Sequence, residues 1–160
     1  MSREAVLSPD SKKWTVDGAT GTVTISDTAL HQTVYIFKCA KATVIIKGKV
    51  ASVAIDNCDE TQVLMENVVG TVEVTNSKKI QFQVSGSCPS ASVDKTVGCN
   101  IFLMSDDAKK CQLSTAQHSD VQITYMGKGD EMVEVPIPEQ FVHTLGDDGK
   151  ITSAVSELYG

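Results

Sequence analysis

The strongest constraint on the fold is an apolar pattern that repeats every 19 residues between positions 34 and 103. Steps of 19 residues from Val34, Ile36, Val44 or Ile46 meet only apolar side chains. The other members are Val53, Val72, Ala91, Ile55, Val74, Val93, Val63, Phe82, Ile101, Met65, Val84 and Leu103. Because apolar residues make up only 41% of the chain, agreement at all these positions indicates a true structural repeat.

The apolar residues of each half-repeat lie two positions apart, as in Val44 and Ile46 or Val53 and Ile55. This period is typical of β-strands with one buried face, and the residues are largely β-branched. A unit of two short strands cannot bury its apolar face alone, so such units stack and share one core. We therefore predict an all-β solenoid with two strands in each 19-residue coil.

Turn-forming residues follow the same period. Gly48, Asn67 and Gly86 share one phase, where we expect a corner of left-handed backbone, since Gly and Asn tolerate positive φ best. A second corner is predicted half a repeat away, where polar and small residues should stack along the solenoid axis. Its members are Lys38-Cys39, Asn57-Cys58, Asn76-Ser77 and Lys95-Thr96.

Three segments are expected along the chain. Residues 1–13 are polar and form a loose lead-in, residues 14–126 form the solenoid, and residues 127–160 form a strap and a hairpin of the same domain. The first coil is expected to begin with Ile25, 19 residues before Val44. The last strand is expected at Val121–Ile123, where the period becomes 20 residues.

The C-terminal segment has a different character. Met132–Phe141 contains Pro136 and Pro138, which exclude a central strand and predict an extended strap that leaves the solenoid. Residues 146–149, Gly-Asp-Asp-Gly, predict the turn of a terminal hairpin. An isolated hairpin is only marginally stable, so this one either caps its own solenoid or crosses to another subunit.

Composition excludes several classes of function. The net charge of −6 argues against a general nucleic-acid or anionic-membrane surface. The five cysteines are odd in number and lack a C-x-x-C pair, which fits free thiols in a reducing cytosol. Cys39 and Cys58 are expected to stack as core thiols, so we expect no metal ion and no cofactor.

Chemistry-bearing residues do not form a recognisable catalytic pattern. His118, Ser119 and Asp120 are sequence neighbours, whereas the members of a triad converge from separate places. No phosphate-loop motif occurs around Gly127. The chain is therefore expected not to be an enzyme.

The outward row Ile45, Leu64 and Phe102 is a candidate protein-interaction surface, unless the strap or the hairpin covers it.

Several runs together resemble the carboxy-terminal domain of the cyclase-associated protein family. They are Ile46-Lys47-Gly48-Lys49-Val50, Asp56-Asn57-Cys58, Val68 to Val74, Asn76-Ser77, the strap Pro136-Ile137-Pro138-Glu139-Gln140-Phe141 and the end Ser156-Glu157-Leu158-Tyr159-Gly160. The resemblance extends from about Trp14 to Gly160.

The resemblance implies a right-handed parallel β-helix that binds monomeric actin in the cytoplasm. It further implies a preference for ADP-bound actin monomers, promotion of nucleotide exchange, and a homodimer in which the C-terminal hairpins are exchanged.

Site residues follow from the matched motifs. The resemblance implies actin contacts at Lys47, Lys49, Asp56, Asn57, Asn76, Ser77, Lys95, Thr96, Glu157 and Tyr159. Tyr159 departs from the small residue of the family pattern. The dimer contacts are expected at Pro136, Pro138, Phe141, Ile151, Val155 and Leu158.

Two other functions stay open at this point. One is a β-helical dimerisation scaffold without an actin role. The other is a GTPase activator similar to tubulin-folding cofactor C, which uses an arginine to stabilise charge on the transferring phosphoryl group. The only arginine here is Arg3, outside the repeats, and lysine lacks the planar fork of arginine. The resemblance to the actin-binding family is therefore preferred.

Overall fold

The computed structural model describes residues 4–156, and most of them lie in β-strands. Two short 3-10 turns, η1 (Ala108–Lys110) and η2 (Lys128–Asp130), interrupt the strands. The strands are β1 (Val6–Leu7), β2 (Lys13–Asp17), β3 (Gly21–Ile25), β4 (Thr33–Phe37), β5 (Ala42–Val50), β6 (Ser52–Asp56), β7 (Asp59–Val68), β8 (Thr71–Thr75), β9 (Lys78–Ser87), β10 (Ser90–Leu103), β11 (Gln112–Met126), β12 (Met132–Pro136), β13 (Phe141–Leu145) and β14 (Ile151–Val155).

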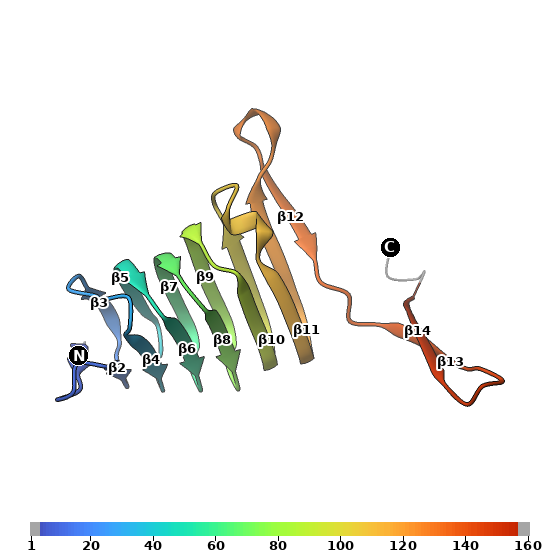
Figure 1. Cartoon of the computed structure of the whole chain (residues 1–160), viewed down its shortest axis with the longest axis horizontal. Coiled ribbons are helices and arrows are strands. Elements are labelled where there is room, and N and C mark those ends of the chain that lie inside the picture. The colour runs from blue at the N-terminus through green and yellow to red at the C-terminus, as the bar shows by residue number, and fades with distance from the viewer. Residues whose placement is uncertain (1–3, 157–160) are drawn as a thin grey trace.

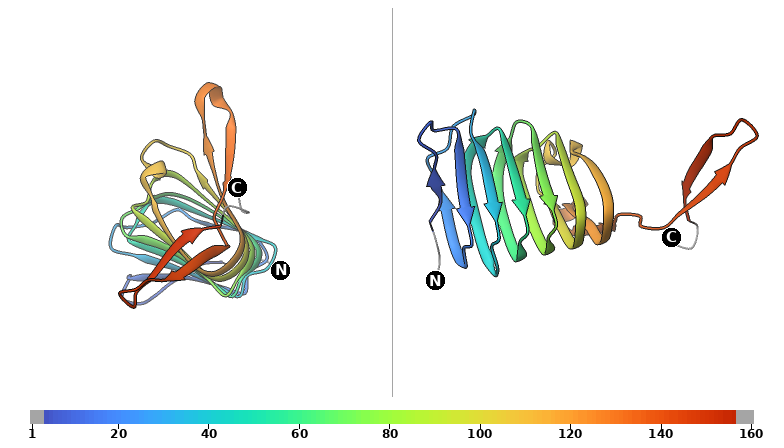
Figure 2. Two further views of the ribbon diagram at one scale, coloured as in Figure 1. Left: turned by 90° about the vertical axis from the view of Figure 1, so that its right-hand side faces the viewer. Right: turned by 90° about the horizontal axis from the view of Figure 1, so that it is seen from below.

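The strands wind into a parallel β-solenoid, as the repeat predicts (Figure 1). A first wall contains β2, β4, β6, β8 and the beginning of β10, and a second wall contains β3, β5, β7, β9 and the end of β10. Each coil contributes one strand to each wall, so the walls face each other across one core. Figure 2 shows the coils side by side along the axis.

Strand register confirms the 19-residue period. Val34 pairs with Val53, which pairs with Val72, and on the second wall Val44 pairs with Val63, which pairs with Phe82. All sixteen repeated apolar residues are at most 4% exposed. The predicted core is therefore the observed core, because alternation along each strand turns one side chain in two toward the interior.

The period lengthens at both ends of the solenoid, which corrects two expectations. Ile25 pairs with Ile46, 21 residues later, and not with Val44. Ile101 pairs with Ile123, 22 residues later, whereas a period of 20 would pair it with Val121. The additional residues loop out at corners, and the second loop contains η1, so the walls keep their inward alternation.

Gly48, Asn67 and Gly86 do not form the left-handed corner that we predicted. Of these, only Gly48 has a positive φ, of 86°, while Asn67 and Gly86 lie within β7 and β9. Gly86 is required for a different reason, because an added Cβ would lie 2.6 Å from the carbonyl oxygen of Glu66. The residues with positive φ form two ladders three positions apart: Lys38, Asn57, Asn76, Lys95 and Gln117, then Lys41, Glu60, Lys79, Gly98 and Asp120.

The N-terminal segment is more ordered than the loose lead-in that we expected. β1 pairs antiparallel with β2, and Leu7 lies opposite Trp14. The Ser8 and Asp10 side chains accept backbone N–H bonds from Lys12 at 3.3 and 3.1 Å. This small hairpin closes the first coil, and the Trp14 indole N–H donates to Gln32 at 2.9 Å.

The strap leaves the solenoid later than its prolines indicate. β12 pairs antiparallel with the end of β11, from Gln122 opposite Pro136 to Met126 opposite Met132. Pro136 is tolerated because it ends an outer strand. After Pro138 the chain extends away from the coils to the β13–β14 hairpin (Figures 1 and 2). The predicted terminal hairpin is present, and the Gly146 N–H closes its turn on the Lys150 carbonyl at 2.9 Å.

Candidate protein-interaction surface

The corner after the first wall presents a ladder of polar side chains at the predicted phase. Asn57, Asn76 and Lys95 are exposed and have φ between 49° and 55°. A surface cavity of about 710 Å³ lies beside them, and Lys78, Lys79 and Val97 contribute to its lining. Val97 is 59% exposed, so this corner combines amide, cationic and apolar groups on a rigid backbone.

Ser77 and Thr96 support this corner from the inside. Thr96 is fully buried and Ser77 is 6% exposed. The Ser77 hydroxyl donates to the Thr75 carbonyl at 2.8 Å and accepts the Cys58 N–H at 3.1 Å. The Thr96 hydroxyl donates to the Asp94 backbone carbonyl at 2.9 Å. Their side chains therefore hold the left-handed turns in place, and the accessible groups belong to the preceding residues in the ladder.

Charges at the corner are partly paired. Lys78 lies 3.6 Å from Asp59, and Lys79 lies 3.7 Å from Glu60. All four side chains are substantially exposed, so each pair contributes little to stability. Lys95 forms no ion pair within the part of the chain that the structure describes, which leaves its ammonium group available for an acidic partner.

Asp56 connects the corner to an aromatic cluster on the first wall. It accepts a hydrogen bond from the Tyr35 hydroxyl at 3.1 Å. The Tyr35 and Phe37 rings stack with centroids 5.5 Å apart, and Lys13 and Lys38 lie over them. Burial, together with the bond to Asp56, raises the pKa of the Tyr35 hydroxyl, so it remains a donor at neutral pH.

Sequence reasoning did not assign Tyr35 and Phe37 to a site. The available signal was their outward position, two residues apart, directly before the Lys38 corner. Such rings act as anchors in many protein interfaces because they bury large area with few rotatable bonds.

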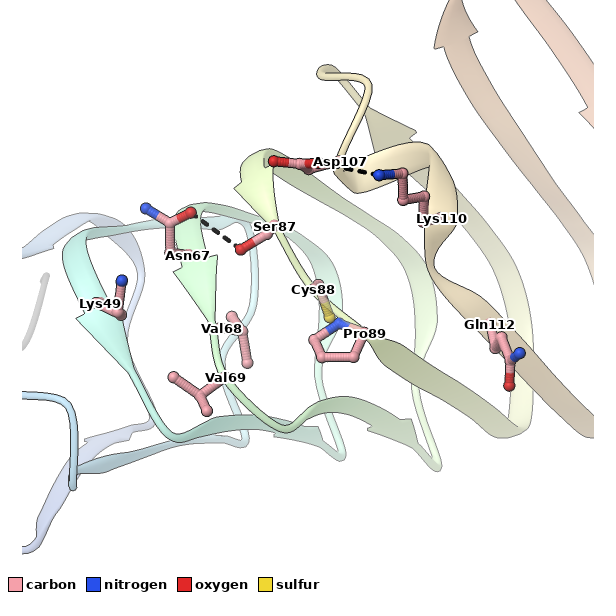
Figure 3. A pocket seen from close by; sticks show the side chains of 10 residues that line it. All are labelled: Lys49, Asn67, Val68, Val69, Ser87, Cys88, Pro89, Asp107, Lys110 and Gln112. Carbon is pink, nitrogen blue, oxygen red and sulfur yellow. Dashed lines mark hydrogen bonds and ion pairs between the residues drawn. The ribbon is translucent and has the colours of Figure 1, made fainter.

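Lys47 and Lys49 lie at a different corner, at the end of β5. Both are exposed, and Lys49 lines a cavity of about 660 Å³ together with Asn67, Val69 and Lys110 (Figure 3). The ion pair between Lys110 and Asp107 spans 3.5 Å at the rim of this cavity. The structure thus divides the expected contact residues between two corners, with Asp56, Asn57, Asn76 and Lys95 at the first.

The expected tail and dimer residues are only partly described. Glu157, Leu158 and Tyr159 lie outside the described residues. Pro136 ends β12, Pro138 follows it, and Phe141, Ile151 and Val155 lie in the terminal hairpin. These three hairpin side chains are 46%, 60% and 48% exposed.

The second wall carries the apolar row that we singled out. Ile45, Leu64 and Phe102 are half-buried. Among the described residues, β12 pairs with β11 and the β13–β14 hairpin lies beyond the coils, away from β5 and β7 (Figures 1 and 2). Glutamines flank the row, and the hollow that Leu64 and Phe102 line with Gln62 and Gln83 is only about 130 Å³.

Within residues 4–156, no three His, Cys, Asp or Glu side chains gather closely enough to hold a metal ion, and no helix is long and apolar enough to cross a membrane.

Comparison with known proteins places this geometry in a family. The family model for the adenylate cyclase associated (CAP) C terminal matches residues 3–158. Human adenylyl cyclase-associated protein 2 is 45% identical over 155 residues, and human adenylyl cyclase-associated protein 1 is 38% identical over 158 residues. The alignments cover 96% and 98% of this chain but only 32% and 33% of the relatives, so the chain spans about a third of their length.

A solved structure agrees with these matches. The cyclase-associated protein from Cryptosporidium parvum superposes with a TM-score of 0.88 at 27% identity, covering 98% of this chain and 96% of that one. The repeat, the solenoid and the terminal hairpin therefore have one common explanation: the chain belongs to the family defined by the C-terminal domain of adenylyl cyclase-associated proteins.

Proposed function

We propose that this chain binds actin monomers, prefers the ADP-bound form, and promotes exchange of the bound nucleotide. The supporting observation is the exposed Asn57, Asn76 and Lys95 ladder, held on a rigid wall in a chain of this family. Tyr35 and Phe37 extend that surface with apolar area, and Asp56 adds an acceptor. Lys47 and Lys49 provide a second contact region at the neighbouring corner.

Nucleotide exchange of this kind requires no catalytic group, and we propose that the chain is not an enzyme. A partner that binds the open state of actin more tightly than the closed state increases the population from which nucleotide leaves. A difference of about 2.7 kcal/mol between the two affinities corresponds to about 100-fold in that equilibrium. A stiff solenoid suits this role, because little binding free energy is lost in ordering its surface.

A homodimer formed by exchanged hairpins is the second part of the proposal. Within residues 4–156, β13 and β14 pair only with each other, and all ten of their residues are exposed. Two-stranded hairpins with apolar side chains are marginally stable alone, so this one gains stability by adding to another sheet. The first part of β11, from Gln112 to Ser119, pairs on one side only and offers such an edge in a second copy.

Two further expectations are part of the same proposal. We propose a cytoplasmic location, associated with the actin cytoskeleton. We also retain the division into a solenoid over residues 14–126 and a strap with hairpin over 127–160, although β1 extends the ordered region before residue 14.

The test is release of a fluorescent nucleotide from ADP-actin monomers with and without the chain. We expect faster release, and we expect Asn57→Ala combined with Lys95→Ala to abolish the acceleration. Lys128→Ala is the matched control, because Lys128 is an exposed lysine in η2 and lines neither of the two cavities.

Each outcome distinguishes the three functions considered above. Binding without faster release would restrict the role to monomer binding. A dimer that does not bind actin would favour the scaffold. Stimulated GTP hydrolysis by a small GTPase would favour the cofactor C-like function.

A further inference from the structure

The solenoid contains two pairs of neighbouring cysteines, and one of them has a half-buried member close to the surface. The Cys88 thiol donates to the Ser90 carbonyl at 3.0 Å, and the Cys111 thiol donates to the Gln112 carbonyl at 3.9 Å. Ser90 and Gln112 are direct partners on neighbouring strands. The two thiols therefore occupy adjacent coils and affect each other's ionisation.

The other pair is more deeply buried, and its two cysteines lie at matching positions of neighbouring coils. The Cys39 and Cys58 thiols donate to the carbonyls of Phe37 and Asp56 at 3.6 and 3.4 Å, and these residues are also strand partners. Cys39 is 1% exposed and Cys58 is 2% exposed. Cys58 lines the cavity of about 710 Å³, but both members of this pair are buried, whereas Cys111 is only half-buried.

Access to the first pair is better. Cys88 lines the cavity of about 660 Å³ beside Lys49 (Figure 3). Cys88 itself is only 2% exposed, so only a small reagent reaches it from the cavity. Cys111 is half-buried at the end of η1, so the second sulfur is also close to solvent.

The surroundings of Cys88 favour its ionised form. When Cys88 ionises, the Cys111 thiol can donate to it instead of to the Gln112 carbonyl, and this lowers the pKa of Cys88 against the opposing effect of burial. Lys49 lines the same cavity and adds positive charge, whereas the charge of Lys110 is offset by its ion pair with Asp107. Since the thiolate is the reactive species, Cys88 is the member of the pair that reacts first.

We propose that Cys88 and Cys111 are a redox modification site that forms a reversible intrachain disulfide with hydrogen peroxide. The Cys88 thiolate attacks one peroxide oxygen, the O–O bond breaks, and the products are a sulfenic acid on Cys88 and, after protonation, one water. The Cys111 sulfur then attacks the Cys88 sulfur and displaces the hydroxyl group, which takes the Cys111 proton and leaves as a second water. Peroxide is reduced to two waters, and two thiols become one disulfide.

The disulfide joins the corner between β9 and β10 to the segment between η1 and β11. That segment places Ala108, which is fully buried, against the core of the last coil. The covalent link therefore fastens the longest insertion of the solenoid, and a dithiol reductant releases it.

The experiment treats the folded chain with hydrogen peroxide, quenches it, and alkylates the remaining thiols after unfolding. Intact mass and peptide mapping then locate the oxidised sulfurs. We expect loss of two hydrogens per chain, a peptide crosslinked between Cys88 and Cys111, alkylation of Cys39, Cys58 and Cys99, and reversal by dithiothreitol.

Single variants test the order of the steps. Cys111→Ser is expected to leave a sulfenic acid on Cys88 that dimedone traps, and Cys58→Ser is expected to oxidise like the parent chain. A disulfide between Cys39 and Cys58 would overturn the proposal. So would a fully reduced chain under conditions that oxidise a free cysteine.

Discussion

Replacing Lys95 by glycine separates the contribution of the corner to folding from its contribution to binding. Lys95 has a φ of 50°, in the left-handed region, although it is a long L-residue. Holding a non-glycine residue there costs roughly 1–2 kcal/mol. Glycine adopts this backbone without that penalty, but it loses about 0.5–1 kcal/mol through the greater freedom of the unfolded chain.

The difference between these contributions predicts that Lys95→Gly changes the free energy of unfolding by about 0 to +1.5 kcal/mol. The variant also loses the unpaired Lys95 ammonium group at the candidate surface. We therefore expect equal or higher stability together with slower nucleotide release from ADP-actin than the parent chain produces.

Urea unfolding followed by circular dichroism and by Trp14 fluorescence measures the first quantity. Coincident transitions from the two probes justify a two-state analysis. The matched control is Lys78→Gly, because Lys78 is an exposed lysine without positive φ at the next coil. It should destabilise the chain by about 0.5–1 kcal/mol, since there glycine removes no strain.

A loss of more than about 1 kcal/mol in Lys95→Gly would refute the reasoning about left-handed strain. Unchanged nucleotide release by a stable variant would instead remove Lys95 from the binding surface while leaving the account of the fold intact.

Three further predictions concern the core, a buried thiol and the hairpin. Ile55→Ala removes three carbons from a fully buried ladder, so urea unfolding should show a free energy of unfolding lower by about 2–5 kcal/mol. The exposed control Glu73→Ala should lose less than about 0.5 kcal/mol. Equal losses in the two variants would contradict the buried ladder. Burial raises the pKa of Cys99 from 9.0 to about 12. Because this thiol ionises at lower pH in the unfolded chain, the free energy of unfolding should fall as pH rises from about 9 toward 12. Urea titrations at alkaline pH should show a smaller fall for Cys99→Ala. Phe141→Asp combined with Val155→Asp should convert a dimer to a monomer in sedimentation equilibrium at unchanged solenoid stability, and a persistent dimer would place the interface elsewhere.

The position of the candidate surface shows where sequence reasoning was limited. Asn57, Asn76 and Lys95 were predicted to share a corner because they follow buried strands at a fixed period, and the structure brings them together. Lys47 and Lys49 flank Gly48, which the repeat placed at the other corner, and the structure has them there, at the end of β5. A repeat gives the phase of each residue, whereas the relative position of two corners depends on how the chain bends between them.

Glycine-based reasoning about corners was the least successful. Gly86 and Asn67 suggested left-handed turns, yet Gly86 is needed for its close approach to Glu66. The actual left-handed positions include Lys38, Lys95 and Glu60, which have no intrinsic preference for that conformation. The ladder of hydrogen bonds in the neighbouring coils imposes their backbone geometry, so the residue type alone does not reveal it.

The sequence by itself determined the solenoid, its buried ladders and the presence of a terminal hairpin, because alternation and a fixed period are local properties of the chain. Only the tertiary structure decided the 21- and 22-residue coils at the ends, the pairing of β12 with β11 and the placement of Cys88 and Cys111 on neighbouring coils. These features depend on loops whose length the core does not constrain. They become fixed only when neighbouring coils provide hydrogen-bond partners and a surface against which to pack.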